Sequence, residues 1–438
     1  MSESDVLALF DQVGFTPPPN VSLQDAFRML LELAQQQQAE AERAARPPRG
    51  RTAVHPSEPT AQAAAGVLAK YGASVAPIPA SPVGCEVTGV DVAAAEGALP
   101  PDLAGALEVL MAVHGFVLLR GQGRPQNESG VAGTYLTAEQ QCRLSECFGA
   151  GALHSTHGVH PEAPCRDIFR LSNDPDHGFN SVGPEWHNDG SFCREVFGHV
   201  VYHIVKAPAG GGDTRFAHLG VAHDQLSAAL QRRLGRCASV NSNGGAVHPL
   251  AAPHPLSGRP SLYLHLGMTG AMLEVLPSAD GGGASCGGGE GGVPLCAPVA
   301  PEGLPRAKPA EAARLGLAPQ VVAWRDGEMD PFFSAFSSLL DDPRVSYSHR
   351  WREGDVIIID NLAVAHKAAP SAHTLASGLR ILHRTTVLSS RPHDPPAHLG
   401  LPHTLPTAAA CPFERGATWR EGYVGFRWGA WEERSVPH

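Results

Sequence analysis

A histidine and an aspartate two positions apart, in the run of residues 184–192, are the first residues that could do chemistry. In an extended strand side chains alternate between faces, so His187 and Asp189 would point the same way and their donor atoms could meet. His366, just past the apolar strand 356–359, is the best candidate for a third ligand. Two histidines and one carboxylate with open positions are used for non-haem Fe(II) and oxygen activation. The alternative is a surface or turn pair, because His-x-Asp often occurs by chance.

Two arginines late in the chain form a second group. Arg380, Leu382 and Arg384 occupy alternate positions, so in a strand both guanidinium groups share one face. Buried cations are costly unless paired, and a small carboxylate or sulfonate anion would supply the pairing. The alternative is that both arginines pair with protein carboxylates or lie on an exposed face. His383 points to the opposite face, and we expect a structural role for it.

The elements that must position these groups are mostly short strands. We predict strands at residues 84–92, 114–120, 168–171 and 200–205 and around Trp351, Ile358 and Leu382. We predict helices at residues 102–112, from Thr137 with a capping box to Gln140, through 226–234 and at 332–340. Short strands at close spacing, with 48 glycines and 39 prolines for turns, favour an antiparallel sandwich.

Three segments fall outside the main domain, which we place at residues 76–390. Residues 1–60 form a helical, partly disordered appendage that docks on the body, mediates self-association into a homo-oligomer or remains a loose arm. The segment 278–308, rich in Gly, Ala and Pro, cannot bury enough apolar surface to offset its ordering entropy, so we expect a disordered insertion. Residues 391–438 form an extension whose tryptophans should pack back on the body.

Composition narrows the functional class and the compartment. The net charge is -10 and there is no block of lysine or arginine, so we expect no nucleic-acid partner. No apolar run approaches the length of a membrane span, so we expect no membrane association. The nine cysteines are odd in number and form no Cys-x-x-Cys pair, which favours a reducing compartment. We therefore expect a cytoplasmic protein.

Seven short motifs of the sequence occur in the same order as in a known protein family. They are residues 84–92, 114–122, 186–189, 211–214, the His-Pro pairs at 248 and 254, residues 354–366 and residues 380–384. Over most of residues 76–390 the sequence resembles the taurine dioxygenase family, the Fe(II)- and 2-oxoglutarate-dependent oxygenases that include taurine and 2,4-dichlorophenoxyacetate dioxygenases. The resemblance implies a fold that is mainly β with flanking helices, built on a double-stranded β-helix, or jelly roll.

The resemblance also implies the cofactors and the residues that hold them. Iron would be bound by His187, Asp189 and His366, and the far carboxylate of 2-oxoglutarate would bind Thr214 and Arg380. The 2-oxo acid would chelate Fe(II), and O2 would take a coordination position vacated by water. The expected outcome is hydroxylation of the substrate with release of succinate and CO2.

The expected substrate is a small organic anion. By resemblance Arg384 faces its acidic group, helped by a histidine of the 154–160 loop, where His154, His157 and His160 are the candidates. A sulfonate or an aryloxyalkanoate fits, whereas Gly183 stands where taurine dioxygenase has an asparagine, which points away from taurine itself. The alternative from another functional class is a catalytically inactive jelly roll that binds a metal or a small anion. A hydrolytic zinc enzyme would not explain the threonine and arginine pair.

Overall fold

The computed structural model describes residues 60–123, 135–149, 159–180, 182–242, 245–277, 317–389 and 399–405. All of them belong to one compact unit, Arg51–His438. The predicted N-terminal appendage, the insertion at 278–308 and most of the C-terminal extension lie outside the described residues, and the domain boundaries remain predictions. In the described piece of that extension, Leu399 and Leu405 are buried against a cluster of apolar side chains that includes Val240 and Leu273.

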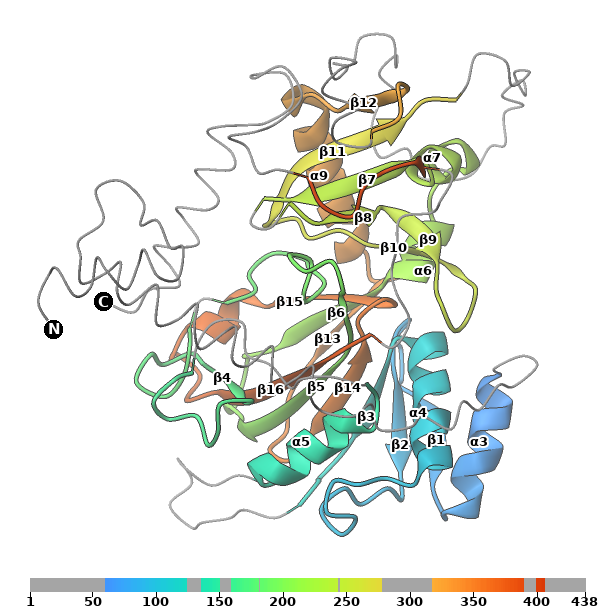
Figure 1. Cartoon of the computed structure of the whole chain (residues 1–438). Helices are drawn as coiled ribbons and strands as arrows, with labels where there is room; N and C mark the ends of the chain where they lie inside the picture. The colour runs from blue at the N-terminus through green and yellow to red at the C-terminus, as the bar shows by residue number, and fades with distance from the viewer. Residues whose placement is uncertain are drawn as a thin grey trace, which may run out of the picture. The chain divides into compact units, whose positions relative to one another are not determined.

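The largest sheet has seven strands in the order β1-β2-β3-β14-β5-β16-β4 (Figure 1). Its strands are β1 (Ser74–Pro77), β2 (Cys85–Thr88), β3 (Phe116–Leu119), β4 (Phe169–Ser172), β5 (Phe197–Lys206), β14 (Val356–Asp360) and β16 (Ile381–Leu388). Neighbouring strands run antiparallel except β2 and β3, which are parallel. β14 comes from the second half of the chain and lies between β3 and β5, which come from the first half.

Three smaller sheets complete the β structure of the described residues. A three-stranded sheet has the order β13-β6-β15, formed by β6 (Thr214–His218), β13 (Ser346–His349) and β15 (Val364–Ala368). A four-stranded sheet has the order β12-β11-β7-β8, formed by β7 (Cys237–Asn241), β8 (Val247–Pro249), β11 (Thr269–Val275) and β12 (Val321–Ala323). The last sheet pairs β9 (Ala251–Pro253) with β10 (Pro260–Leu262).

Six α-helices are described. They are α3 (Ala61–Lys70), α4 (Pro101–His114), α5 (Ala138–Glu146), α6 (Leu219–Asp224), α7 (Ala228–Leu234) and α9 (Asp326–Asp341). The predicted capping box at Thr137 is present at the start of α5. The helix predicted through 226–234 is confirmed as α7, which begins two residues later than predicted because the side chain of the N-cap Ser227 accepts a hydrogen bond from Leu230 N. None of the described helices is long and apolar enough to cross a membrane.

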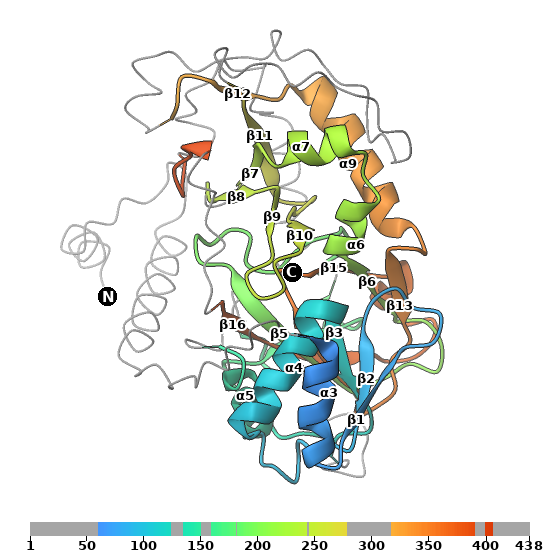
Figure 2. The same cartoon turned by 90° about the vertical axis from the view of Figure 1, so that its right-hand side faces the viewer.

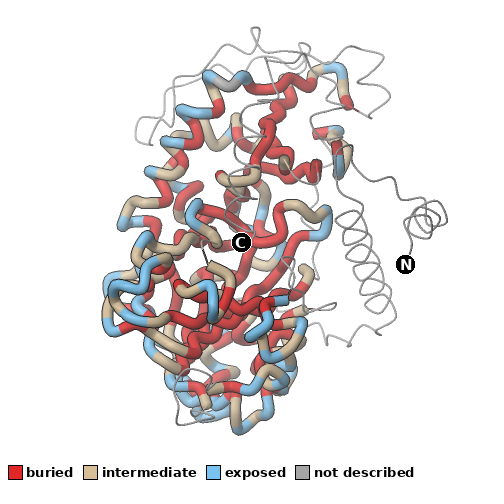
Figure 3. The backbone as a smooth tube through the Cα atoms, turned by 90° about the vertical axis from the view of Figure 1, so that its left-hand side faces the viewer, coloured by how far each residue is buried: buried red, intermediate tan, exposed pale blue. Residues whose placement is uncertain are grey.

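The two faces of the seven-stranded sheet bury different partners because side chains alternate along each strand. Val117 and Leu119 of β3 pack in a cluster with residues of α3, α4 and α5, and Figures 1 and 2 show α3 and α4 side by side next to β1 and β2. Phe116 and Leu118 pack in a second cluster with Phe216 of β6. Buried residues gather in the interior of the described chain (Figure 3). The second cluster lies between the seven-stranded sheet and the sheet that contains β6, where a site can form between the two sheets.

Candidate active site

The backbone joins His187 to His366. His187 N donates to His366 O over 3.1 Å, and His366 N donates to His187 O over 3.0 Å, which makes an isolated antiparallel bridge beside β15. The ring centroids of the two histidines are 4.1 Å apart. His187 Nδ1 donates to Glu185 O over 2.7 Å, so Nε2 carries the lone pair that can bind a metal.

Asp189 lies in a turn, so the predicted strand spanning both His187 and Asp189 is wrong. Asn361 holds this turn at both backbone groups: Asp189 N donates to Asn361 Oδ1 over 2.9 Å, and Asn361 Nδ2 donates to Asp189 O over 2.8 Å. Gly190 follows with φ of 79°, and a Cβ there would lie 2.9 Å from the Phe197 ring. The turn thus needs glycine after the aspartate, and it returns the carboxylate to the side where the histidines lie.

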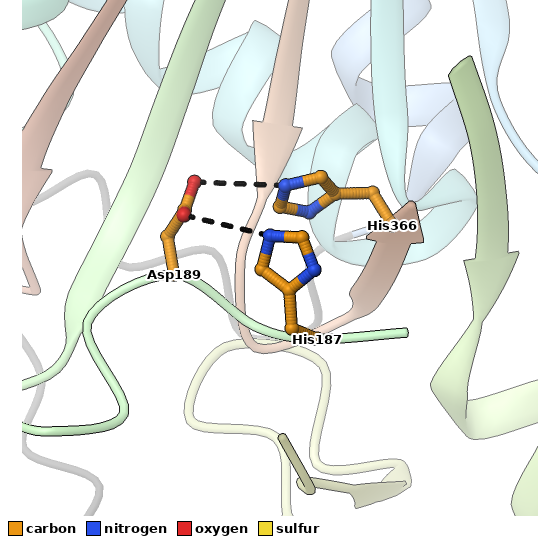
Figure 4. Close-up of side chains that lie close together, drawn as sticks. All are labelled: His187, Asp189 and His366. Carbon is orange, nitrogen blue, oxygen red and sulfur yellow. Dashed lines mark ion pairs between the residues drawn. The ribbon is translucent and has the colours of Figure 1, made fainter. Parts of the chain in front are cut away.

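The three side chains converge (Figure 4). One donor atom from each of His187, Asp189 and His366 lies within 4.8 Å of the others, and all three residues are buried. Asp189 Oδ1 is 3.9 Å from His187 Nε2, and Asp189 Oδ2 is 3.7 Å from His366 Nε2. Burial lowers the pKa of both histidines, that of His366 to about 3, so both rings are neutral at neutral pH. Two neutral imidazoles and one carboxylate are a donor set that fits Fe(II).

Arg380 is a buried cation that has no charged partner among the described residues. Its Nε donates to Gly212 O over 2.9 Å and its Nη2 to Thr214 Oγ1 over 3.2 Å. No carboxylate of the described chain lies within ion-pair distance of it. Burial lowers the pKa of Arg380 to about 10, which still leaves it charged at neutral pH. The expectation that a buried arginine here awaits a small anion therefore stands for Arg380.

Thr214, at the start of β6, complements this arginine. Its Oγ1 accepts a second hydrogen bond, from Trp351 Nε1 over 3.0 Å. With two donors already directed at the oxygen, the threonine O–H must donate elsewhere. A carboxylate beside Arg380 would be a suitable acceptor.

Arg384 is not the free cation that the sequence suggested. Its Nη1 donates to Asp189 Oδ1 over 2.8 Å, and its guanidinium carbon lies 4.4 Å from the centroid of the Phe169 ring. Its Nε is buried and has no hydrogen-bond partner among the described residues. For Arg384 the pairing with a protein carboxylate, left open as the alternative, is what the structure shows. The physical reason is that a buried guanidinium is costly unless it is paired, and the Asp189 carboxylate lies within reach of it.

One pocket connects these groups. Among the residues that line it are His187, Tyr202, Thr214, His366, Arg380 and Arg384. Leu382 lines the same pocket, so the predicted common face of the alternating residues 380, 382 and 384 is confirmed. The pocket therefore reaches from the histidines to the Arg380 and Thr214 pair.

The remaining histidines singled out from the sequence are those of the 154–160 loop and His383. His154 and His157 lie outside the described residues. His160 uses both ring nitrogens locally, since Nε2 donates to Pro175 O over 3.0 Å and Nδ1 accepts from Glu162 N over 3.1 Å. His383 is buried, and its Nε2 lies 2.9 Å from Arg170 Nη1, which confirms its structural role.

Sequence reasoning missed two side chains at this site. Tyr202 has its hydroxyl 2.8 Å from His366 Nε2, and the ring of His265 lies 5.0 Å from that of His187, centroid to centroid. A signal for Tyr202 was available: it alternates with Val200 and Ile204 along β5, so it is the polar member of an inward face. No comparable pattern marks His265, which lies in a loop.

Comparisons with known proteins place the chain among oxygenases. The family model described as taurine catabolism dioxygenase TauD, TfdA family matches residues 74–386. An alpha-ketoglutarate-dependent sulfonate dioxygenase of Saccharomyces cerevisiae is 26% identical over 222 residues, 44% of this chain and 49% of the relative, so the match spans about half the length of that relative. A tyrosine isonitrile desaturase of Pseudomonas aeruginosa is 25% identical over 286 residues, 63% of this chain and 79% of the relative.

Two further likenesses concern most of the main domain. An alpha-ketoglutarate-dependent sulfate ester dioxygenase of Pseudomonas putida is 23% identical over 318 residues, 71% of this chain and 88% of the relative. The crystal structure of a taurine dioxygenase from Burkholderia xenovorans matches with a TM-score of 0.50 and 21% identity, covering 73% of this chain and 90% of that one. This likeness confirms the predicted jelly-roll fold. The family match over well more than half of the sequence shows that the chain belongs to the taurine catabolism dioxygenase TauD, TfdA family of Fe(II)- and 2-oxoglutarate-dependent dioxygenases.

Proposed function

We propose that this chain hydroxylates a small organic acid, resembling a sulfonate or an aryloxyalkanoate, and converts 2-oxoglutarate and O2 to succinate and CO2. The observation that carries the proposal is the single pocket lined both by His187 and His366 and by the Arg380 and Thr214 pair. An inactive metal or anion binder would have no need of a three-ligand site and a separate carboxylate clamp in one enclosed space.

His187, Asp189 and His366 would hold Fe(II), which supplies the oxygen chemistry when bound. The protein prepares these ligands in two ways. Burial keeps both imidazoles neutral, so no proton has to leave before the nitrogen binds. The Asn361 clamp fixes the turn that carries Asp189, so the carboxylate need not be ordered at the moment of binding.

Arg380 and Thr214 would bind the far carboxylate of 2-oxoglutarate. Arg380 offers a guanidinium that lacks a charged partner, and Thr214 offers an O–H that two incoming hydrogen bonds leave as a donor. A guanidinium and a hydroxyl together can satisfy both oxygens of a carboxylate. Trp351 Nε1 holds the Thr214 oxygen in place and so positions this clamp.

Arg384 would face the acidic group of the primary substrate. It is paired with Asp189, and its Nε has no hydrogen-bond partner in the part of the chain that the structure describes. If Asp189 held a dication, it would share its negative charge with the metal, so Arg384 would be less firmly paired with it and could bind an external anion. The sulfonate and sulfate ester named for two relatives support an anionic substrate. His154 or His157 would assist Arg384 in binding this acidic group.

The test is anaerobic reconstitution with Fe(II) and 2-oxoglutarate, followed by O2 and a panel of sulfonates, carboxylates and sulfate esters. We expect succinate release in step with loss of one acidic substrate, and no turnover by the Asp189→Ala variant. Binding of metal and anion without any succinate would instead favour the inactive binder. If neutral amides or esters were oxidised as well as the corresponding acid, the role of Arg384 would be wrong while the iron assignment survived.

A further inference from the structure

Tyr202 presents a polar group to the pocket that neither the metal site nor the carboxylate clamp uses. Its hydroxyl is 2.8 Å from His366 Nε2 and 3.4 Å from Asp189 Oδ2. Its ring packs against the ring of His366 at 5.6 Å and that of Phe216 at 6.3 Å, centroid to centroid. Tyr202 is 2% exposed, so this hydroxyl must find its hydrogen-bond partners inside the site.

The sheet places Tyr202 next to the arginines as well as the metal ligands. In the antiparallel register of β5 with β16, Tyr202 is the direct cross-strand partner of Arg384. Directly paired residues project from the same face of a sheet. Tyr202, Arg380 and Arg384 accordingly line the same pocket.

Metal binding changes what the Tyr202 hydroxyl can contact. In the tautomer that can bind a metal through Nε2, this nitrogen of His366 accepts the hydrogen bond of Tyr202, and a metal would take the lone pair that accepts it. The phenol O–H then lacks its nearest acceptor, and an unpaired buried donor is costly. The remaining acceptors are Asp189 Oδ2, at a longer 3.4 Å, and whatever occupies the pocket beside the metal.

We propose that Tyr202 is a positioning residue that donates a hydrogen bond to the metal-chelating 2-oxo acid end of 2-oxoglutarate. This inference rests on the proposed function. Arg380 and Thr214 would then fix the far carboxylate, while Tyr202 fixes the near end, so the cosubstrate is held at both ends. The residue makes the protein's affinity for a 2-oxo acid depend on a phenol O–H.

The test uses the full-length Tyr202→Phe variant, which keeps the ring packing and removes only the hydroxyl. Mn(II) alone should bind this variant at least as tightly as the unmodified protein, because His366 Nε2 loses a competing partner. The affinity of the Mn(II)-loaded variant for 2-oxoglutarate should fall about tenfold to a hundredfold, as expected for a hydrogen bond to an anion. Both constants come from titration calorimetry without turnover. A change of opposite sign in the two constants is not expected from a general loss of structure.

A matched control and a second observable sharpen the result. Tyr347→Phe makes the same chemical change in a half-buried tyrosine packed against the same core cluster, outside the pocket, and should alter neither constant. The charge-transfer absorption of the anaerobic Fe(II) and 2-oxoglutarate complex should shift in Tyr202→Phe, because the hydrogen bond acts on the chelating group. Thermal unfolding shows whether each variant is folded.

Three outcomes would overturn the inference. The first is an unchanged 2-oxoglutarate affinity with an unchanged absorption band in Tyr202→Phe. The second is weaker Mn(II) binding by the variant, or a phenolate charge-transfer band in the unmodified protein loaded with Fe(III), since either would make Tyr202 a metal ligand. The third, no 2-oxoglutarate binding by the unmodified metal-loaded protein, would refute the proposed function and this inference with it.

Discussion

Replacing Arg380 by methionine should change 2-oxoglutarate affinity and the stability of the fold in different ways. Arg380 is 5% exposed, and the hydrogen bonds of its side chain reach Gly212 O and Thr214 Oγ1, neither of which carries a charge. A buried cation in that position costs stability unless an anion arrives. We therefore expect Arg380→Met to lose 2-oxoglutarate binding while the free protein keeps its stability or gains some.

The magnitudes follow from the same contacts. Burial lowers the pKa of Arg380 from 12.5 to about 10, which corresponds to a penalty of about 3 kcal/mol for the charged form. The substitution relieves this penalty but leaves Gly212 O without its donor, at a cost of about 1–3 kcal/mol. The net change in free energy of unfolding should lie between about zero and 2 kcal/mol in favour of the variant. Loss of a desolvated charge pair should weaken 2-oxoglutarate binding by about 2–5 kcal/mol.

The assay is urea unfolding of the metal-loaded protein with and without 2-oxoglutarate, together with direct titration of the ligand. The unmodified protein should be stabilised by 2-oxoglutarate, and Arg380→Met should not. Arg170→Met is the matched control, because Arg170 is also buried and donates to a backbone carbonyl, His177 O, but lies outside the pocket. The control should bind 2-oxoglutarate as the unmodified protein does. Unchanged affinity in Arg380→Met, or a loss of more than about 2 kcal/mol of stability, would refute the reasoning.

Asp189→Ala should remove most Fe(II) binding and all turnover while far-ultraviolet circular dichroism stays native, because Asn361 holds this turn through the backbone groups of residue 189; retention of Fe(II) at the unmodified affinity would contradict its role. Arg384→Met should reduce use of acidic substrates far more than it reduces 2-oxoglutarate consumption without substrate, and equal reductions would argue against a substrate contact. Burial lowers the pKa of His203 to about 3 and of His218 and His248 to about 4, so below pH 6.5 the folded state binds fewer protons than the unfolded state. The stability from these neutral histidines is complete above pH 6.5 and is lost as the pH falls toward 4, by roughly 2 kcal/mol per histidine at pH 5, and equal urea midpoints at pH 7 and pH 5 would contradict this.

Much of the site could be predicted from the sequence because strand alternation and family motifs reported the same residues. His187, Asp189 and His366 were expected together, and the structure brings them together, although through a bridge and a turn instead of one strand. Alternation also placed Arg380 and Arg384 on one face correctly. Residue type and spacing therefore predict which way a side chain points better than they predict whether the local backbone is a strand, a bridge or a turn.

The features that could not be predicted depend on contacts between distant residues or on single side chains, which the spacing of residues does not encode. The ion pair of Arg384 with Asp189 joins β16 to a distant turn, and periodicity along one strand carries no information about it. The start of α7 is set by one capping side chain, Ser227, whereas the leucine pattern alone would begin the helix at Leu226. Strand alternation places Tyr202 on an inward face, but only the fold shows that its hydroxyl lies beside His366.

The most direct test of the central claim is a crystal structure of the protein with Fe(II) and 2-oxoglutarate, prepared without oxygen. The account predicts one iron bound by His187 Nε2, Asp189 and His366 Nε2, with the far carboxylate of 2-oxoglutarate on Arg380 and Thr214. Iron located by its anomalous scattering at any other set of residues, or 2-oxoglutarate bound away from Arg380, would contradict it.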